Sequence, residues 1–425
     1  MILKEASWIF ANRGKLCPSS RKFALNSYRP AKFDNCVTYK PHRAFKQRFK
    51  TISVVVQIDN PSVSKQSMDA LARSCSCKIQ KKMQFIHCFS TTVNSKKLEL
   101  LAKNKHIKKI WFDRKFNAYL DKSVSVVAYD TLQQKGLTGK DVVIAVLDTG
   151  IYHHPDLKGR IIAFKDIIKG KKEPYDDNGH GTHVAGAVAS NGSKSNGKFT
   201  APAPSSNLVG VKVLNKVGGG SLSGVLEGIQ WCIENKRRLG INIMNLSLGS
   251  EAILPHYEDP VCVAVEKAWD AGIVVCAAAG NSGPNSKTIG SPAIHPKIIT
   301  VGALDGNNSQ VASYSSRGPT IDGTSKPDVI APGTVISHRS PNSVIDKQNK
   351  SDRVKDWYLT LSGTSMATPI CSGLVAQIVQ YDPSLTPDEI KEIIVASATT
   401  VKKEDKNSQG SGIINAVKLK ENLHT

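Results

Sequence analysis

Three side chains that could together hydrolyse a bond stand far apart in the sequence: Asp148, His180 and Ser365, with gaps of 32 and 185 residues. Ser365 stands in GTSMATP, where a β-like run at 358–361 gives way to a helical pattern. A serine there can cap a helix, but a helix N-terminus also stabilises developing negative charge. A serine nucleophile needs a base with a pKa near the working pH and an acid that orients that base. His180 and Asp148 are the candidates for these two roles.

Both candidates stand where an element begins or ends. Asp148 ends the apolar run VIAVLD directly before a turn through Gly150, and aspartate is also a common turn former. His180 opens the helical stretch HGTHVAGAVAS, with His183 one turn further along. Two histidines at this spacing can bind zinc, but the HExxH pattern and a further ligand cluster are missing. We therefore expect nucleophilic catalysis by an Asp, His and Ser triad, without zinc.

The segments around the three residues resemble the motifs of the subtilisin-like serine proteases. The order Asp, His, Ser is the order of that family, whereas the G-x-S-x-G motif of α/β-hydrolases is absent. Matching segments run from about residue 125 to 420: YHHPDL, GVKVLNKVGGGSLS, NLSLG, AAAGNSG, SSRGP, KPDVIAPG and GTSMATP. Within the family, EPYDDNGHGTH and VKVLNKVGGGSLSGVLEGIQWCIE are most similar to the AprX-like proteases of bacilli.

The resemblance implies a serine endopeptidase that works through an acyl-enzyme intermediate, with Asp148, His180 and Ser365 as its catalytic residues. It implies that Asn281, in AAAGNSG, donates its side-chain amide to the oxyanion together with the backbone N–H of Ser365. It also implies that His183 is structural.

The resemblance further implies how a peptide binds, namely as a strand added between two exposed edges. The implied substrate-binding residues are Gly218, Gly219 and Gly220 on one edge, Ser247, Leu248 and Gly249 on the other, and Gly290 on the floor of the P1 pocket. A triple glycine can equally be a flexible linker. Segments 247–250 and 279–283 contain no Asp or Glu. We therefore expect an apolar or aromatic P1 residue rather than Lys or Arg.

Calcium is the usual stabiliser of this family, and Asp156 in HHPDL matches one calcium ligand. The loop at 189–202 departs in length and sequence from the calcium-binding loop of secreted subtilisins. We expect that no cofactor is required and leave calcium binding at Asp156 open.

The pattern of apolar and polar residues along the chain predicts the helices and strands that position these residues. From residue 141, near-continuous apolar strands alternate with helical stretches, which predicts an α/β fold with a mostly parallel sheet covered by helices on both faces. Active sites of such folds gather at the carboxyl ends of strands. Residues 49–119 show the order β-α-β-β-α-β of a small α+β ferredoxin-like domain, with CKIQKKM as an edge strand. We expect an extended or loosely packed basic extension at 1–48, a propeptide domain at 49–119 and a peptidase domain at 120–425.

The resemblance gives the domain at 49–119 a role, because propeptides of this pattern pack on the protease, assist its folding and leave their tail in the active site. We expect cleavage after Tyr119, which would place Phe116 at P4 and begin the mature enzyme at Leu120. An ordinary surface linker cut by other proteases is the alternative.

The net charge of +22 is concentrated at the front of the chain. Residues 1–122 hold 26 Lys and Arg against 7 Asp and Glu, a net charge of +19, and the remainder holds 31 against 28, or +3. A basic surface can bind nucleic acid, but neither an RNP-like motif nor a zinc finger is present. We expect protein or peptide substrates and the chain's own propeptide as partners, and neither nucleic acid nor membrane. A catalytically silent binding protein and a nucleic-acid-associated protein on this fold remain the alternatives.

The nine cysteines are odd in number, and several, including Cys276 and Cys371, stand in apolar runs where a thiol behaves as a small hydrophobe. The beginning, MILKEASWIFANRGK, lacks the apolar stretch of a secretory signal. No apolar run reaches the roughly 18 to 20 residues of a membrane span. We expect a reducing, cytoplasmic location.

Overall fold

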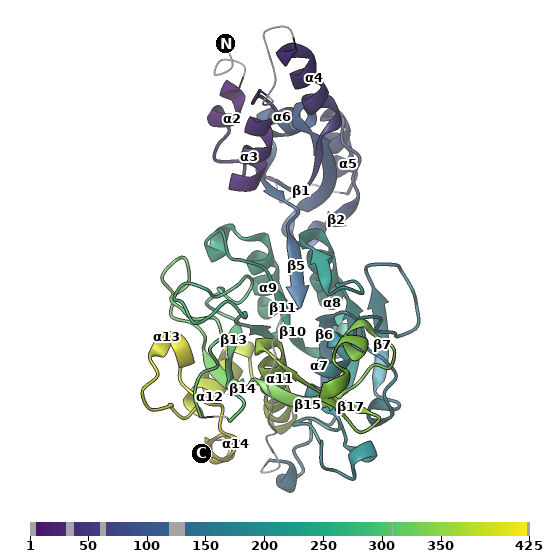
Figure 1. Ribbon diagram of the computed structural model, residues 1–425, viewed down its shortest axis with the longest axis vertical. Coiled ribbons are helices and arrows are strands. Elements are labelled where there is room, and N and C mark those ends of the chain that lie inside the picture. Colours follow the sequence, from purple (N-terminus) through teal and green to yellow (C-terminus); the bar gives the residue numbers. More distant parts are fainter. Residues whose placement is uncertain (1–5, 31–37, 60–64, 119–131, 308, 423–425) are drawn as a thin grey trace. The chain divides into compact units, whose positions relative to one another are not determined.

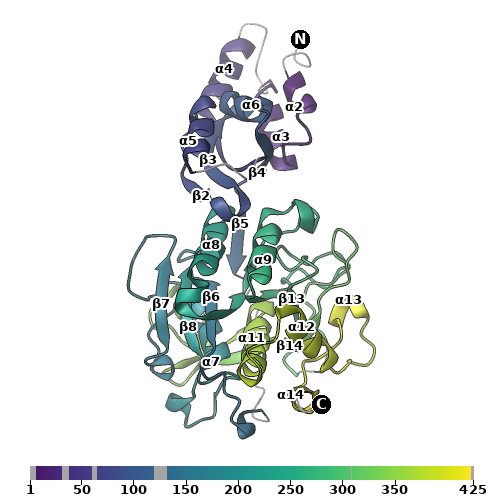
Figure 2. The same cartoon turned by 180° about the vertical axis from the view of Figure 1, so that it is seen from behind.

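The computed structural model describes residues 6–30, 38–59, 65–118, 132–307 and 309–422 (Figures 1 and 2). The chain divides into two compact units, Met1–Arg114 and Lys115–Thr425. None of the described helices is both long and apolar enough to cross a bilayer.

The N-terminal unit contains a four-stranded antiparallel sheet in the order β2-β3-β1-β4. Its elements are β1 (Thr51–Ile58), α5 (Lys65–Ser74), β2 (Lys81–Met83), β3 (Cys88–Asn94), α6 (Ser95–Lys103) and β4 (Ile107–Phe112). The central strand β1 carries three consecutive buried valines, and α6 begins where the side chain of Asn94 accepts a hydrogen bond from Lys97 N (3.0 Å). The predicted β-α-β-β-α-β order, with β2 as an edge strand, is confirmed.

The expectation of an extended or loosely packed segment before residue 49 is wrong for the described residues. This segment forms α2 (Ser7–Ala11), α3 (Pro18–Asn26) and α4 (Tyr39–Phe49). Trp8, Leu16 and Ala24 are buried in the same core as Val54 and Leu98. The first two helices are too short to show a clear 3.6-residue period, so the sequence pattern hid them. Only α4 lacks buried residues among these three helices.

The C-terminal unit is built on a seven-stranded sheet in the order β14-β13-β12-β10-β6-β8-β7, and each neighbouring pair runs parallel. The strands are β6 (Val143–Asp148), β7 (Ile161–Asp166), β8 (Asn207–Lys212), β10 (Ile241–Leu246), β12 (Val274–Ala278), β13 (Ile299–Leu304) and β14 (Val329–Pro332). All six residues of β6 are buried. Burial on both faces explains why the inner strands, such as β6, are continuous apolar runs, whereas the edge strand β7 is only partly buried.

Helices cover both faces of this sheet. The longer helices are α7 (His180–Ala189), α8 (Leu222–Leu239), α9 (Pro260–Asp270), α11 (Thr364–Tyr381) and α12 (Pro387–Ala396). A side chain added at Gly181 of α7 would touch Asp148, whereas one added at Gly228 of α8 would approach Leu147. Successive strand residues point to opposite faces, so α7 and α8 lie on opposite faces of β6. The predicted mostly parallel α/β fold is confirmed.

Two small antiparallel sheets complete the unit. One has the order β15-β17-β16, from β15 (Thr334–His338), β17 (Tyr358–Ser362) and β16 (Arg353–Val354). The other has the order β11-β5-β9, from β11 (Leu248–Gly249), β5 (Lys115–Ala118) and β9 (Gly219–Ser221). The remaining helices of this unit are α10 (Val344–Gln348), α13 (Lys406–Gln409) and α14 (Ala416–Asn422), and its 3₁₀ turns lie at Gln133–Lys135, Pro155–Leu157, Ser193–Ser195, His256–Glu258 and Lys350–Asp352. The N-terminal unit has one 3₁₀ turn among its described residues, Gln84–Ile86.

Candidate active site

Asp148 and His180 meet where β6 ends and α7 begins. His180 Nδ1 lies 2.7 and 2.9 Å from the two carboxylate oxygens of Asp148, and both side chains are fully buried. A carboxylate accepts hydrogen bonds, so Nδ1 carries the proton in this pair. His180 Nε2 is buried without a hydrogen-bond partner in the described part of the chain. The imidazole is therefore held in the tautomer that can accept a proton at Nε2.

Two glycines allow this close approach of strand and helix. A Cβ at Gly181 would lie 2.2 Å from Gly150 O and 3.0 Å from Asp148 Cβ. Gly150 has φ +115°, and a Cβ there would lie 2.0 Å from Tyr175 O. The glycines of DTG and HGTH are thus required by the packing around the Asp148–His180 pair.

Asp176 holds the turn after Asp148 against the first turn of α7. Its Oδ1 accepts hydrogen bonds from Thr149 Oγ1 (2.9 Å) and Gly179 N (2.8 Å), and its Oδ2 accepts from Thr182 N (2.9 Å) and Oγ1 (2.7 Å). A buried carboxylate at a helix N-terminus also stabilises the helix dipole. The sequence interpretation missed Asp176, because it stands three residues before Gly179, the cap of α7, and reaches Thr149 across 27 residues.

Ser365 is fixed at the carboxyl end of β10, the strand next to β6. Its Oγ donates to Ser247 O (2.7 Å), and Ser247 Oγ donates to Ser365 O (2.9 Å). Ser247 directly follows β10, and the helices α7 and α11 pack against each other. The cap of α11 is Gly363, without a side-chain hydrogen bond, so Ser365 is not the helix cap that a serine at this position could have been. The Asp148–His180 pair therefore lies at the carboxyl end of β6, and Ser365, in the first turn of α11, is bonded to the residue that follows the adjacent strand β10.

Asn281 is oriented by Thr364, the residue before Ser365. Asn281 Oδ1 accepts from Thr364 N (3.0 Å) and from Thr364 Oγ1 (2.9 Å). These two donors fix the oxygen of the amide, so its Nδ2 points the other way, buried and without a partner among the described residues. Asn281 is thus a donor ready for an oxyanion. The sequence interpretation did not identify Thr364 as the residue that orients it.

His183 is set for a structural role. Its Nε2 donates to Leu359 O (2.9 Å). Burial lowers the pKa of His183 to about 3, although the hydrogen bond to Leu359 O acts in the opposite direction. The ring of His183 is therefore neutral across the working pH range.

The two predicted substrate edges pair with β5, which lies between them in one small sheet (Figure 1). Phe116 and Asn117 pair with Gly220 and Gly219 on one side, and Asn117 and Ala118 pair with Gly249 and Leu248 on the other. Ala118 N also donates to Gly218 O (3.1 Å). Both edges therefore accept an extended strand in antiparallel register, and the glycines are part of a sheet rather than a free linker.

The segments predicted to form the P1 pocket lie side by side. Ser250 and Ser291 exchange two backbone hydrogen bonds (3.1 and 2.9 Å), and Gly290 N donates to Ala279 O (2.9 Å). Gly290 is buried. The structure thus brings the 247–250 and 279–283 segments together around Gly290.

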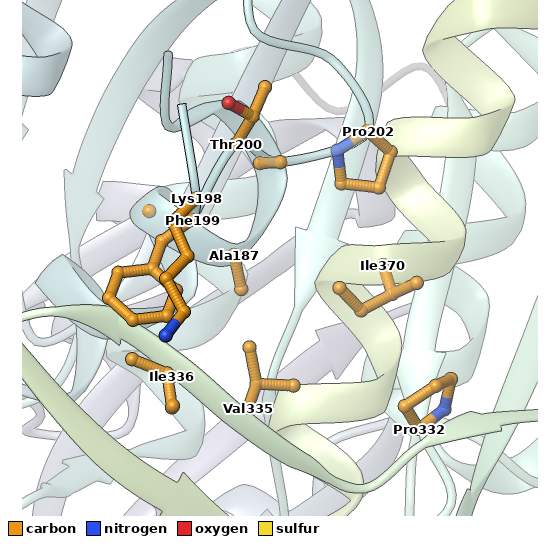
Figure 3. Close-up of a pocket in the computed structure, with 11 residues that line it drawn as sticks. Ala187, Lys198, Phe199, Thr200, Pro202, Pro332, Val335, Ile336 and Ile370 are labelled. Carbon is orange, nitrogen blue, oxygen red and sulfur yellow. The ribbon is translucent and has the colours of Figure 1, made fainter. Parts of the chain in front are cut away.

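A separate small pocket of about 40 Å³ contains none of the three catalytic candidates (Figure 3). Its walls include Ala187 of α7, Val335 of β15, Ile370 of α11 and the nearby Phe199 and Pro202. It is lined by no carboxylate, imidazole or thiol and has room for only a few water molecules. We assign it no catalytic role.

The residues around Asp156 do not fit a calcium ion. Five protein donors already occupy its carboxylate: Ser193 Oγ (2.8 Å) and Lys194 N (2.9 Å) on Oδ1, and Tyr358 OH (2.7 Å), Ser190 Oγ (3.0 Å) and His338 Nε2 (3.3 Å) on Oδ2. Burial alone would raise the pKa of Asp156, but the hydrogen bonds from His338, Tyr358 and the 193–194 turn outweigh it and hold the pKa well below its usual range. Calcium needs six to eight oxygen ligands, whereas these neighbours are mostly donors.

His154 completes this buried cluster with His338 and Asp156. The rings of His154 and His338 stack with centroids 3.6 Å apart. Burial lowers the pKa of His154 to about 3, so its ring is neutral. The cluster stabilises the carboxylate by hydrogen bonds from the protein itself.

We expect stability to be independent of calcium at Asp156. The Tm of Ser365→Ala protein, used to prevent self-digestion, should be the same in EDTA and in millimolar CaCl₂. Asp156→Asn should lower the Tm in both solutions, because it weakens buried hydrogen bonds worth about 1.5–3 kcal/mol each for a charged acceptor. A calcium-dependent rise in Tm that disappears in Asp156→Asn would contradict this reading.

Comparison with known proteins identifies the family to which this chain belongs. Residues 139–412 match the subtilase family, Peptidase S8. Serine protease AprX from Bacillus subtilis (strain 168) is 47% identical over 424 residues, which cover 96% of this chain and 96% of that protein. Subtilisin Savinase from Lederbergia lenta is 37% identical over 293 residues, which cover 69% of this chain and 96% of that protein.

A solved structure agrees at the level of the fold. The crystal structure of fervidolysin from Fervidobacterium pennivorans, described as a keratinolytic enzyme related to subtilisin, matches with a TM-score of 0.71 at 22% identity over 88% of this chain and 61% of that one. The family match, the two relatives and the buried Asp148–His180 pair agree with one another. The chain belongs to the subtilase family of serine proteases, and it is similar to AprX along nearly its whole length.

Proposed function

We propose that this subtilase is an endopeptidase in which Ser365 is the nucleophile, His180 the general base and Asp148 the residue that orients the base. The observation that carries the proposal is the buried Asp148–His180 hydrogen bond, which leaves Nε2 without a partner among the described residues. Ser365, in the first turn of α11, donates a hydrogen bond to the carbonyl of Ser247, which directly follows the neighbouring strand β10. Family membership and this arrangement do not favour a silent binding protein.

Acylation starts when Ser365 Oγ leaves Ser247 O by rotation about its Cα–Cβ bond and gives its proton to His180 Nε2. The oxygen attacks the peptide carbonyl carbon as the proton leaves. Asp148 stabilises the imidazolium that forms, because its two oxygens already contact Nδ1. His180 then returns the proton to the leaving amine, and water repeats the sequence to release the acyl group.

The tetrahedral intermediate carries an oxyanion that needs preorganised donors. Asn281 Nδ2 supplies one donor, since Thr364 holds the amide oxygen on the other side. The backbone N–H of Ser365, in the first turn of α11, supplies the second. Because these groups are fixed before reaction, they stabilise the charge without reorganisation.

The strand β5 supports a substrate role for both edges. It pairs with β9 and β11 in the antiparallel register of an extended peptide, and Phe116 is fully buried there. We propose that residues 49–119 are a propeptide whose tail binds as a substrate, with Phe116 at P4 and Tyr119 at P1. Tyr119 and Leu120 lie outside the described residues.

We expect the enzyme to cut its own chain after Tyr119. N-terminal sequencing should find Leu120 at the new terminus of wild-type protein, and Ser365→Ala protein should remain full length. Phe116→Asp should slow the cut, because a buried charge without a partner is costly. Asn117→Asp is the matched control, since this neighbouring side chain is exposed. The same new terminus in wild-type and Ser365→Ala material would show cleavage by another protease.

We expect an apolar P1 preference, because the segments around Gly290 carry no acidic side chain. Tetrapeptide substrates that end in Phe, Tyr, Leu or Met should have higher kcat/KM than those that end in Lys or Arg. Higher kcat/KM for substrates that end in Lys or Arg would show that the segments around Gly290 do not form the P1 pocket.

A cytoplasmic location remains part of the proposal. It is supported by the eight free cysteines of the described residues, which are all buried as thiols. Cell fractionation with an antibody against the chain tests it, and recovery in the culture medium alone would oppose it.

A further inference from the structure

A buried lysine beside the Asp148–His180 pair has no part in the mechanism above. Lys212 is the last residue of β8 and stands opposite Asp148 in the pairing of β8 with β6. Its side chain is 0% exposed. Burying an ammonium group costs several kcal/mol unless close partners compensate. The contacts of this group therefore show what it holds in place.

Lys212 connects the two segments that carry the acid and the base. Its Nζ donates to Thr149 O, in the turn directly after Asp148. It also donates to Asp177 Oδ1 (2.8 Å), three residues before His180. One charged group thus ties the end of β6 to the entry of α7.

The carboxylate of Asp177 is stabilised in its charged form by the two lysines that contact it. Burial alone would raise the pKa of Asp177, but hydrogen bonds and charge from Lys212 and Lys169 outweigh it and lower that pKa. Lys169 Nζ lies 3.3 Å from the other oxygen of Asp177, and its side chain is half exposed. The ring of Tyr175 lies 5.0 Å from Lys212 Nζ, and its hydroxyl donates to Asp166.

We propose that Lys212 is a positioning residue for Asp148 and His180, an inference that rests on the proposed function of those two residues. The hydrogen bond of 2.7 Å between them depends on the spacing between the turn at Thr149 and the segment at Asp177. Lys212 fixes that spacing from the adjacent strand. A displacement of about 1 Å at a reacting group can cost on the order of 10²-fold in rate.

The kinetic test compares Lys212→Met, Lys212→Arg and Lys169→Met. Lys212→Met should lower kcat per titrated active site by about 10- to 100-fold with KM changed less than about twofold. Lys212→Arg should recover most of the loss, because it keeps the charge and the donors. Lys169→Met is the matched control, since it removes a lysine from the same carboxylate without touching Thr149, and it should change kcat less than about twofold.

A second readout does not depend on activity. In the Ser365→Ala protein, the proton on His180 Nδ1 should give a downfield NMR resonance that marks its hydrogen bond to Asp148. Lys212→Met should shift or broaden that resonance, and Lys169→Met should not. If Lys212→Met does not fold, Asp177→Asn serves instead, because it removes the charged partner of Lys212 and should lower kcat by about tenfold.

The outcomes separate the two proposals. Undiminished kcat per active site in Lys212→Met, with an unchanged His180 resonance, would overturn the positioning role and leave Lys212 as a contributor to folding alone. Undiminished proteolysis by Ser365→Ala protein would instead overturn the proposed function, while the resonance would still report whether Lys212 orients His180.

Discussion

Replacing Ser365 by Ala is expected to lower kcat by on the order of 10⁶-fold, the size of effect that removal of the catalytic serine has in the related enzyme subtilisin. The reason is that alanine has no oxygen to form the acyl bond, although His180 Nε2 is still prepared to take a proton. Hydrolysis of casein and of a chromogenic peptide, corrected for the amount of folded protein, measures the loss.

His180→Ala should cost about as much, and the double variant should cost little more than either single one. When two residues act as a unit, replacing either one already removes most of their joint contribution to kcat. The two losses in kcat therefore do not add. Ser397→Ala is the control, because Ser397 is also a buried serine but bonds to Ile394 O in α12. Losses that multiply in the double variant would show that the two residues act separately.

Replacing Asn281 by Leu is expected to lower kcat by ~10²–10³-fold with little change in KM. Leucine has a similar size but no donor, so the oxyanion loses one of its two hydrogen bonds. The effect belongs mainly to the transition state, since the negative oxygen forms only there. Steady-state kinetics on one peptide substrate separates kcat from KM.

Two further variants refine this prediction. Asn281→Asp keeps the acceptor for Thr364 N but removes the donor and adds charge, so it should be at least as severe as Asn281→Leu. Thr364→Val removes one of the two bonds that orient the amide and should give a smaller loss. A rise in KM with unchanged kcat in Asn281→Leu would contradict an oxyanion role.

The sequence predicted those parts of the molecule whose residues form continuous patterns. The strands of the large sheet were recognisable because burial on both faces makes them apolar throughout, as in β6. Asp148, His180 and Ser365 were predicted as the catalytic residues from the resemblance of their flanking motifs to those of subtilases, and close packing requires the glycines at 150 and 181 in the first two motifs. The pairing of Gly219 and Gly249 with an extended strand followed from the same resemblance.

The parts that were missed depend on single side chains that act across long separations. Asp176 reaches Thr149 over 27 residues, and Thr364 reaches Asn281 over 83. Such contacts leave no periodic trace in the sequence. Asp156 shows a different difficulty, because its motif matches a calcium ligand of the family. In the structure its carboxylate instead accepts hydrogen bonds from hydroxyl, imidazole and backbone donors, and the sequence did not show that these donors lie near it.

The most direct test of the central claim is labelling with a fluorophosphonate, followed by mass spectrometry of the digested protein. We expect one adduct per molecule on the peptide that contains Ser365, no adduct in Ser365→Ala protein, and much slower labelling in His180→Ala protein. An adduct on another residue, or equal labelling of wild-type and Ser365→Ala protein, would contradict the assignment of Ser365 as the nucleophile.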